Sequence, residues 1–145
     1  MKTTLRALSV LISTFCIVSP AFGNQPLASG TVVLDKSLEA KAKGIRTLFL
    51  VIYNPESKMP MPYGAKKVAL KSDAKGKFHN FQLDMGSISL MPAAKMGGKL
   101  QTMRIKARLD KDGSAGRDQP GDIYGEVSKV AVGAKNVTIT LNKMK

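Results

Sequence analysis

Short runs of β-forming residues alternate with turn residues along most of the chain, which is the pattern of an all-β sandwich or barrel. The pattern predicts seven strands, at residues 30–35, 45–53, 64–71, 77–84, 99–110, 123–132 and 136–142. The run at 45–53 is the most continuously apolar and is predicted to be the central buried strand. In 99–110 polar and apolar residues alternate, so one side of that strand is expected to face the core. The residues on that side are Met103, Ile105, Ala107 and Leu109.

The segments between these runs contain little that favours helices. Only 36–43 and 89–96 have a composition that suits a helical turn. Five prolines lie between the predicted strands, where a missing amide hydrogen costs no ladder hydrogen bond. They are Pro55, Pro60, Pro62, Pro92 and Pro120. The expected fold is a seven-stranded antiparallel immunoglobulin-like β-sandwich, with a small β-barrel as the alternative.

The start of the chain has the pattern of a secretory signal peptide. Two basic residues precede an apolar stretch at 7–18, and small residues suited to cleavage follow. Cleavage before Asn24 leaves 122 residues (145 minus 23), enough for one domain with its own core. We therefore expect a signal peptide at 1–23, a short linker at 24–29 and a single β-sandwich domain at 30–145, exported to the periplasm in soluble form.

The chain is basic, with 23 Lys and Arg against 10 Asp and Glu and a formal net charge of +13. Two of these cations belong to the predicted signal peptide, which leaves +11 (13 minus 2) on the exported protein. Such a surface favours anionic partners, for example envelope lipid or polysaccharide, and their binding weakens with salt. For an exported protein, nucleic acid is not an expected partner. No transmembrane segment is expected after cleavage.

The residues needed for common enzyme and metal sites are scarce. His79 is the only histidine, and Cys16, the only cysteine, falls in the predicted signal peptide. No Ser-His-acid or Cys-His triad with a nucleophile motif can be assembled, and zinc requires several converging ligands. We therefore expect a non-enzymatic protein with no catalytic residues and no cofactor.

An aspartate-rich stretch at 110–122 resembles a calcium loop only superficially. It lacks the glycine and the glutamate that an EF-hand loop requires at its sixth and twelfth positions. It is interpreted as a long hairpin loop with two turn dipeptides. These dipeptides are Asp112-Gly113 and Pro120-Gly121.

Methionine is the one compositional excess, and two Met-Pro pairs stand side by side at residues 59–62. Each proline holds the chain extended, so the pairs present methionine side chains on a stiff segment that loses little entropy when a partner docks. Two other interpretations remain open. Methionine also fills irregular cores, and its thioether sulfur selects Cu(I). The candidate copper ligands are Met59, Met61, Met91 and Met96.

Five segments, in order, resemble the C-terminal periplasmic domain of the cytochrome c biogenesis factor CcmI/CycH, which takes part in attaching haem to apocytochromes c. The segments are SGTVVLDKSLEAK, IRTLFLVIYNPESKMPMPYGAKKV, FQLDMGSISLMPAAKM, IKARLDKDGSAGRDQPGDIYGEV and VAVGAKNVTITLN. Together they span most of the predicted mature chain. That family domain is immunoglobulin-like and normally follows two transmembrane helices and a tetratricopeptide array, whereas this chain shows neither.

The resemblance implies a periplasmic, chaperone-like binding module of c-type cytochrome biogenesis. Its expected partners are apocytochrome c or other cytochrome c maturation proteins, including haem-ligation components. The family offers no catalytic residues to carry over, so the site expectation concerns partner binding in the segments that match. The expected partner-binding residues are Met59, Pro60, Met61, Pro62, Met91, Pro92, Arg108, Gly121 and Asp122.

Overall fold

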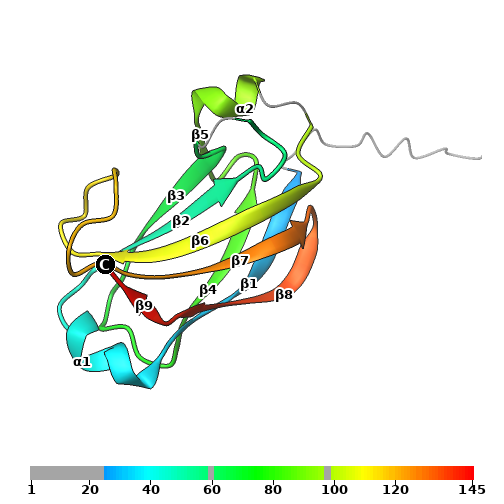
Figure 1. Cartoon of the computed structure of the whole chain (residues 1–145). Coiled ribbons are helices and arrows are strands. Elements are labelled where there is room, and N and C mark those ends of the chain that lie inside the picture. The colour runs from blue at the N-terminus through cyan, green and yellow to red at the C-terminus, as the bar shows by residue number, and fades with distance from the viewer. Residues whose placement is uncertain (1–24, 59–60, 97–98) are drawn as a thin grey trace, which may run out of the picture.

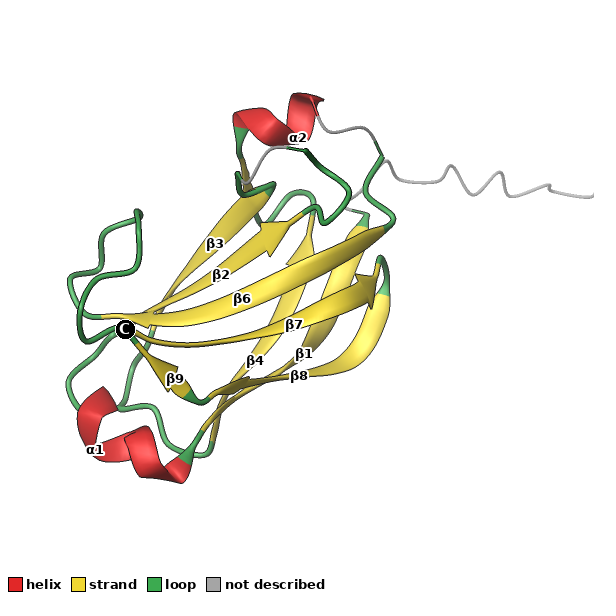
Figure 2. Ribbon diagram, viewed as in Figure 1, coloured by secondary structure: helices red, strands yellow, loops and turns green. Residues whose placement is uncertain are grey.

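The computed structural model describes residues 25–58, 61–96 and 99–145 (Figure 1). The predicted signal peptide and the residues Met59 and Pro60 therefore lie outside the described residues. In the described part of the chain, the strands form two facing sheets and no closed barrel (Figure 2). The predicted immunoglobulin-like sandwich is confirmed, and all seven predicted strands are present.

The smaller sheet has three strands in the order β4-β1-β8. Their bounds are Pro26–Leu34 for β1, Lys77–Asp84 for β4 and Ala134–Leu141 for β8. β1 pairs with β8 in parallel, which differs from the predicted antiparallel arrangement, whereas every other strand pair in the described ranges is antiparallel. β1 begins four residues earlier than the predicted start at 30, because Leu27 and Ala28 are buried. Residues 26–29 thus belong to the strand instead of a linker.

The larger sheet has six strands in the order β5-β3-β2-β6-β7-β9. Their bounds are Ser89–Leu90 for β5, Gly64–Ala69 for β3, Thr47–Tyr53 for β2, Thr102–Asp110 for β6, Ile123–Ala131 for β7 and Lys143–Met144 for β9. β2 lies inside this sheet, as its continuous apolar run predicts. β5 and β9 are two-residue edge strands that the sequence pattern did not predict.

Within the described residues, helical structure is limited to three short segments: the 3-10 turn η1 at Lys36–Leu38, α1 at Glu39–Ala42 and α2 at Pro92–Met96. All three fall within the two predicted helical turns. The Asp35 carboxylate starts the first of them by accepting a hydrogen bond from the Ser37 backbone N–H at 2.9 Å. None of the described helices is long or apolar enough to cross a membrane.

The core lies between the two sheets and is built from the inward side of each strand. Met103, Ile105, Ala107 and Leu109 of β6 are all fully buried, as the alternation in 99–110 predicts. They meet buried side chains from the other main strands. These include Leu48, Leu50, Ile52, Val32, Leu34, Phe81, Leu83, Ile123, Ile139 and Leu141.

Two glycines allow strands to approach more closely than a side chain would permit. A Cβ on Gly30 in β1 would lie 1.8 Å from the Val137 carbonyl oxygen of β8. A Cβ on Gly125 in β7 would lie 1.8 Å from the Thr140 carbonyl oxygen of β8. In both cases the obstructing atom belongs to the backbone of β8, which cannot move aside as a flexible side chain can. The packing of β8 against both of its neighbours therefore depends on these glycines.

Candidate functional site

The outer face of the six-stranded sheet, directed away from the core, carries aromatic residues opposite cations. Phe49 and Tyr53 of β2 pair in register with Arg108 and Arg104 of β6. The two guanidinium carbons lie 5.3 Å and 4.2 Å from the respective ring centroids. Paired residues of antiparallel strands share a face, so each cation is brought over its ring by strand register. These residues form a floor that is apolar with a cationic border.

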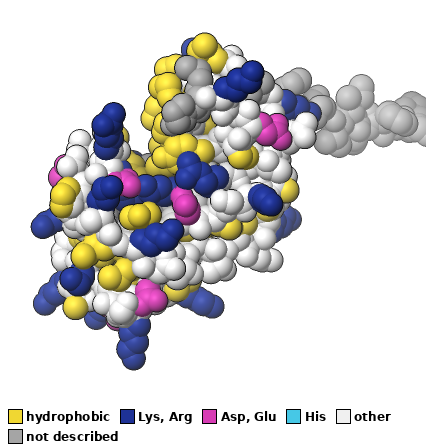
Figure 3. Space-filling model, in the orientation of Figure 1, with side chains coloured by type: hydrophobic (Ala, Val, Ile, Leu, Met, Phe, Trp, Pro, Cys, Tyr) yellow, Lys and Arg dark blue, Asp and Glu magenta, His cyan; other side chains and the backbone are white. Residues whose placement is uncertain are grey.

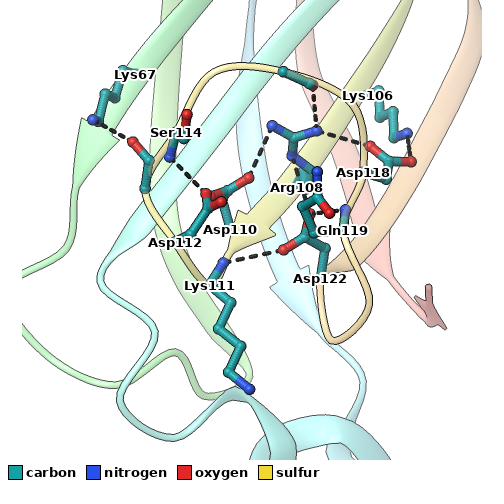
Figure 4. Close-up of polar contacts among 12 residues, drawn as sticks. Lys67, Lys106, Arg108, Asp110, Lys111, Asp112, Ser114, Asp118, Gln119 and Asp122 are labelled. Atoms are coloured by element: carbon teal, nitrogen blue, oxygen red, sulfur yellow. Dashed lines mark hydrogen bonds and ion pairs between the residues drawn. The ribbon is translucent and has the colours of Figure 1, made fainter.

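The loop at 111–121 folds over this outer face and is attached to it by three cations, as Figure 4 shows. Lys67 of β3 donates a hydrogen bond to the Gly113 carbonyl at 2.7 Å. Arg108 donates to the Gly116 carbonyl at 2.9 Å, and Lys106 pairs with Asp118. The loop therefore forms a wall over one end of the sheet.

Turn geometry in this loop agrees with the two predicted turn dipeptides. Gly113 and Gly121 have φ angles of 70° and 95°. These values lie in the left-handed region that glycine adopts without strain. Asp112 further shapes the first turn by accepting a hydrogen bond from the Ser114 backbone N–H at 2.8 Å. The predicted hairpin loop thus adopts the predicted turns, but it lies against the sheet.

A buried charge cluster around Arg108 supports the base of the loop. The Arg108 guanidinium lies 2.9 Å from an Asp110 carboxylate oxygen, 2.9 Å from one of Asp118 and 3.8 Å from one of Asp122. The side chains of Arg108, Asp110 and Asp122 are 5%, 1% and 1% exposed. A charge buried to this degree needs compensation, and here one cation serves several carboxylates.

Asp122 also holds the two ends of the loop together. Its carboxylate accepts hydrogen bonds from the backbone N–H groups of Lys111, at 3.1 Å, and Gln119, at 2.8 Å (Figure 4). Gly121, beside it, donates its backbone N–H to the Lys145 carbonyl at 3.2 Å. Both residues were expected to contact a partner. The structure places Asp122 in the interior, where it stabilises the loop that forms the wall.

The pKa values of Asp110 and Asp118 in this cluster are shifted in opposite directions. Burial raises the pKa of Asp110, and the neighbouring carboxyl groups of Asp112 and Asp122 raise it further, although Arg108 opposes them. Burial would also raise the pKa of Asp118. There, however, hydrogen bonds and charge from Lys106 and Arg108 prevail and hold the pKa below its ordinary value of 3.8. Asp118 is thus a carboxylate held in its ionised form by two cations.

We expect Asp118→Asn to lower the free energy of unfolding by about 1 kcal/mol at neutral pH, because the side chain is partly exposed. A carboxyl whose folded-state pKa is lowered stabilises the fold above its unfolded pKa, and the contribution is lost as pH falls through the folded-state value. The difference between the parent and Asp118→Asn should therefore be full well above pH 3.8, shrink as the pH falls below 3.8, and vanish only below the lower folded-state pKa. Urea unfolding at a series of pH values measures this difference, and a difference independent of pH would contradict the assignment.

The opposite wall is formed by two methionine-containing loops. Tyr63 joins them through its backbone, because its N–H donates to the Ile52 carbonyl at 2.7 Å and its carbonyl accepts from the Met91 N–H at 3.0 Å. This brings Met61 and Pro62, just before Tyr63, next to Met91. Met61 is 43% exposed, so it can contact a partner directly.

Between the two walls lies a groove of about 700 Å³ on the outer face of the larger sheet. Its floor includes Phe49, Val51 and Tyr53 of β2, and its walls are the loop at 111–121 and the methionine loops. Figure 3 shows the corresponding hollow, with apolar side chains on one side and Lys and Arg on the other. The volume lies in the range of about 300–1,000 Å³ that is typical of ligand sites.

The structure brings four of the expected partner-binding residues to this groove: Met61, Pro62, Met91 and Arg108. Pro92 begins α2 next to Met91 and does not line the groove. Among the candidate copper ligands, Met61 and Met91 share the groove, whereas Met96 is 72% exposed and does not line it.

Sequence reasoning did not identify the residues of the groove floor, or Arg117 and Asp118 of the loop, as part of the site. Phe49, Tyr53, Lys106, Arg117 and Asp118 also line the groove. The floor had a detectable signal, because the central strand is apolar on both of its sides and its neighbour 99–110 presents three cations on its polar side. Arg117 and Asp118 had no such signal in the sequence, because their placement depends on how the long loop folds.

His79 lies away from this groove, in a smaller hollow of about 330 Å³ between β3 and β4 that Val68, Leu70 and Phe78 also line. Burial, and then the charge of Lys66, lower the pKa of its imidazole, so the ring is neutral over a wider pH range. Within the described ranges, no group of three His, Cys, Asp or Glu side chains is arranged to hold a metal ion.

Comparison with known proteins gives one match. The family model described as the cytochrome c-type biogenesis protein H Ig-like domain matches residues 29–142. No curated protein and no solved structure matches the chain. The matched range covers both sheets except for β9 and the first three residues of β1, and it includes every described residue of the groove except Lys145.

Proposed function

Because the chain belongs to the family of the cytochrome c-type biogenesis protein H Ig-like domain, which has a role in c-type cytochrome biogenesis, we propose that its outer-face groove binds apocytochrome c. In this role the protein is a non-enzymatic, chaperone-like module that acts in the periplasm. The observation that carries the proposal is the meeting of Met61, Pro62 and Met91 with Arg108 in one groove.

The groove suits an unfolded polypeptide for two reasons. Methionine side chains are flexible and polarisable, so they adapt to apolar residues of different shapes. Their backbone, by contrast, is held in place by Pro62 and by the hydrogen bonds of Tyr63, which reduces the entropy lost on docking. Before haem attachment a c-type cytochrome exposes apolar side chains that its folded form buries, and these are the groups that such a wall contacts.

We expect Met61→Asp to weaken binding of haem-free apocytochrome c about tenfold or more, because an anion at a central apolar contact costs on the order of 1.4 kcal/mol. The measurement is the Kd of the purified protein from Asn24 onward, which contains all described strands. Met144→Asp is the matched control, since Met144 is 45% exposed, against 43% for Met61, and does not line the groove.

Folded holocytochrome c should bind more weakly than the haem-free form. Equal effects of the two methionine substitutions, or no binding of apocytochrome c, would contradict the groove as its site. If a purified haem-ligation component binds in its place and Met61→Asp weakens that binding, the partner is the haem-ligation component.

A further inference from the structure

The two walls of the groove differ in chemistry, and this difference restricts what it can bind. One wall is apolar and consists of Met61, Pro62 and Met91. The other side carries the cations of the described lining, Lys106, Arg108, Arg117 and Lys145, with Asp118 as its single acidic side chain. A ligand that fills the groove therefore meets an apolar surface and an excess of positive charge at the same time.

The cationic side already holds one carboxylate, which belongs to the protein itself. Asp118 accepts a hydrogen bond from Arg108 at 2.9 Å and pairs with Lys106 through its other oxygen. Its side chain is 22% exposed, so the pairing takes place at the groove surface. Two cations on separate oxygens are an arrangement typical of carboxylate recognition. The groove is thus shaped to bind a carboxylate beside its apolar wall.

Arg117 supplies a positive charge that nothing in the described part of the chain neutralises. The other three described arginines each have a carboxylate partner: Arg46 pairs with Asp73, Arg104 with Glu126, and Arg108 with its cluster. Arg117 is exposed, lines the groove and has no ion pair or hydrogen bond from its guanidinium within the described ranges. It is therefore available to an anion from a partner.

The apolar side continues beyond the groove. Four large hydrophobic side chains are exposed in the described residues, and three of them, Met61, Leu90 and Met96, belong to the methionine loops, β5 and α2. Figure 1 shows β5 and α2 together at one end of the sandwich, beside β3. The strand floor from Phe49 to Tyr53 adds about 13 Å of length, at 3.3 Å per residue. A partner segment thus has room for several apolar side chains.

Resting on the proposed function of the groove, we propose that it selects polypeptide segments in which a carboxylate side chain follows a run of apolar side chains. The apolar run lies against Met61, Leu90 and Met91. The carboxylate lies beside Arg117 and competes with Asp118 for Lys106 and Arg108. Charge complementarity favours this occupant over a neutral or basic segment, and the apolar wall favours it over a purely ionic one.

The test uses a labelled peptide, Gly-Leu-Phe-Ala-Leu-Glu-Glu-Gly, and the same peptide with both glutamates replaced by glutamine. Fluorescence anisotropy gives both affinities for the protein from Asn24 onward. We expect the glutamate peptide to bind about five- to tenfold more tightly at low salt, and the preference to shrink as salt screens the charges. Arg117→Glu should abolish the preference, whereas Lys135→Glu, an equal charge change on the smaller sheet, should retain most of it.

Asp118→Asn provides a second, opposite readout. This substitution removes the carboxylate that competes with the peptide. The affinity for the glutamate peptide should therefore rise about threefold or more, while the affinity for the glutamine peptide should change little. A thermal melt of each variant shows that the fold is intact. Weaker binding of the glutamate peptide to a folded Asp118→Asn protein would overturn the competition between the two carboxylates.

The outcomes separate this proposal from the function on which it rests. If both peptides bind equally and Met61→Asp weakens both, the groove is a docking site without carboxylate selection, and the proposal is overturned alone. If neither peptide binds and apocytochrome c binds regardless of Met61, the groove itself is not the site. If polyphosphate displaces the glutamate peptide and Met61→Asp has no effect, binding is purely ionic and the proposal also fails.

Discussion

Replacing Arg108 with leucine should lower the free energy of unfolding by about 3–5 kcal/mol, the usual cost of removing one partner from a buried ion pair. The guanidinium is the cation that Asp110 and Asp122 share, and both carboxylates are almost completely buried. Leucine fills much of the space but leaves these charges uncompensated. The effect should be measured by urea denaturation at neutral pH, with the loop at 111–121 also expected to become more susceptible to proteolysis.

Arg104→Leu is the matched control for this prediction. Arg104 stands on the same strand and the same face, but it is 37% exposed and pairs with an exposed Glu126. A surface pair of this kind contributes about 0–1 kcal/mol. The cost of Arg108→Leu should also diminish in acid, where the carboxyl groups become neutral, beginning with Asp110 because its pKa is raised. Similar losses for the two arginines would show that the cluster does not depend on its cation.

Gly30→Ala should destabilise the fold by at least about 3 kcal/mol, at the upper end of overpacking effects. The added Cβ would lie 1.8 Å from the Val137 carbonyl oxygen, so β1 and β8 would have to separate. The same argument applies to Gly125→Ala against Thr140. Thermal and urea unfolding measure the loss, and failure to recover folded protein would be the extreme form of the same result.

Gly116→Ala is the control for the general effect of adding a methyl group. A Cβ at Gly116 would have no atom within 4 Å, and its φ angle is not in the left-handed region. We expect a change within about 0.5 kcal/mol of the parent protein, as for ordinary surface substitutions. If Gly30→Ala were equally mild, the close approach of β1 to β8 would not be a constraint on the fold.

The sequence was informative about the fold where side-chain alternation carried the signal. In 99–110 the alternation assigns Met103, Ile105, Ala107 and Leu109 to the core, and all four are buried. It was silent about β5 and β9, because a two-residue strand has no period of its own and forms only through pairing with β3 and β7. The start of β1 was also missed, since Leu27 and Ala28 lie in a stretch whose Pro, Ser and Gly suggest a linker.

The candidate site was predicted only in part, for a related physical reason. Stiff Met-Pro segments are visible in a sequence, so Met61 and Pro62 could be selected as a docking surface. The pairing of Asp118 with Arg108 could not, because it requires the loop to fold back across the sheet, and no local pattern specifies that path. Asp122 shows the converse. An aspartate in a loop sequence is expected to be exposed, whereas Asp122 is fully buried and its carboxylate accepts hydrogen bonds from backbone amides.

The position of β1 between β4 and β8 has a consequence for how the chain acquires its structure. Gly30 pairs with Val137, which is 107 positions later (137 minus 30), so the smaller sheet cannot be completed until nearly the whole polypeptide is available. Contacts between such distant segments form only after a loss of loop-closure entropy, and chains rich in such contacts fold slowly. Folding of this domain is therefore coupled to the arrival of β8, and a nascent chain that lacks β8 keeps one edge of β1 unpaired.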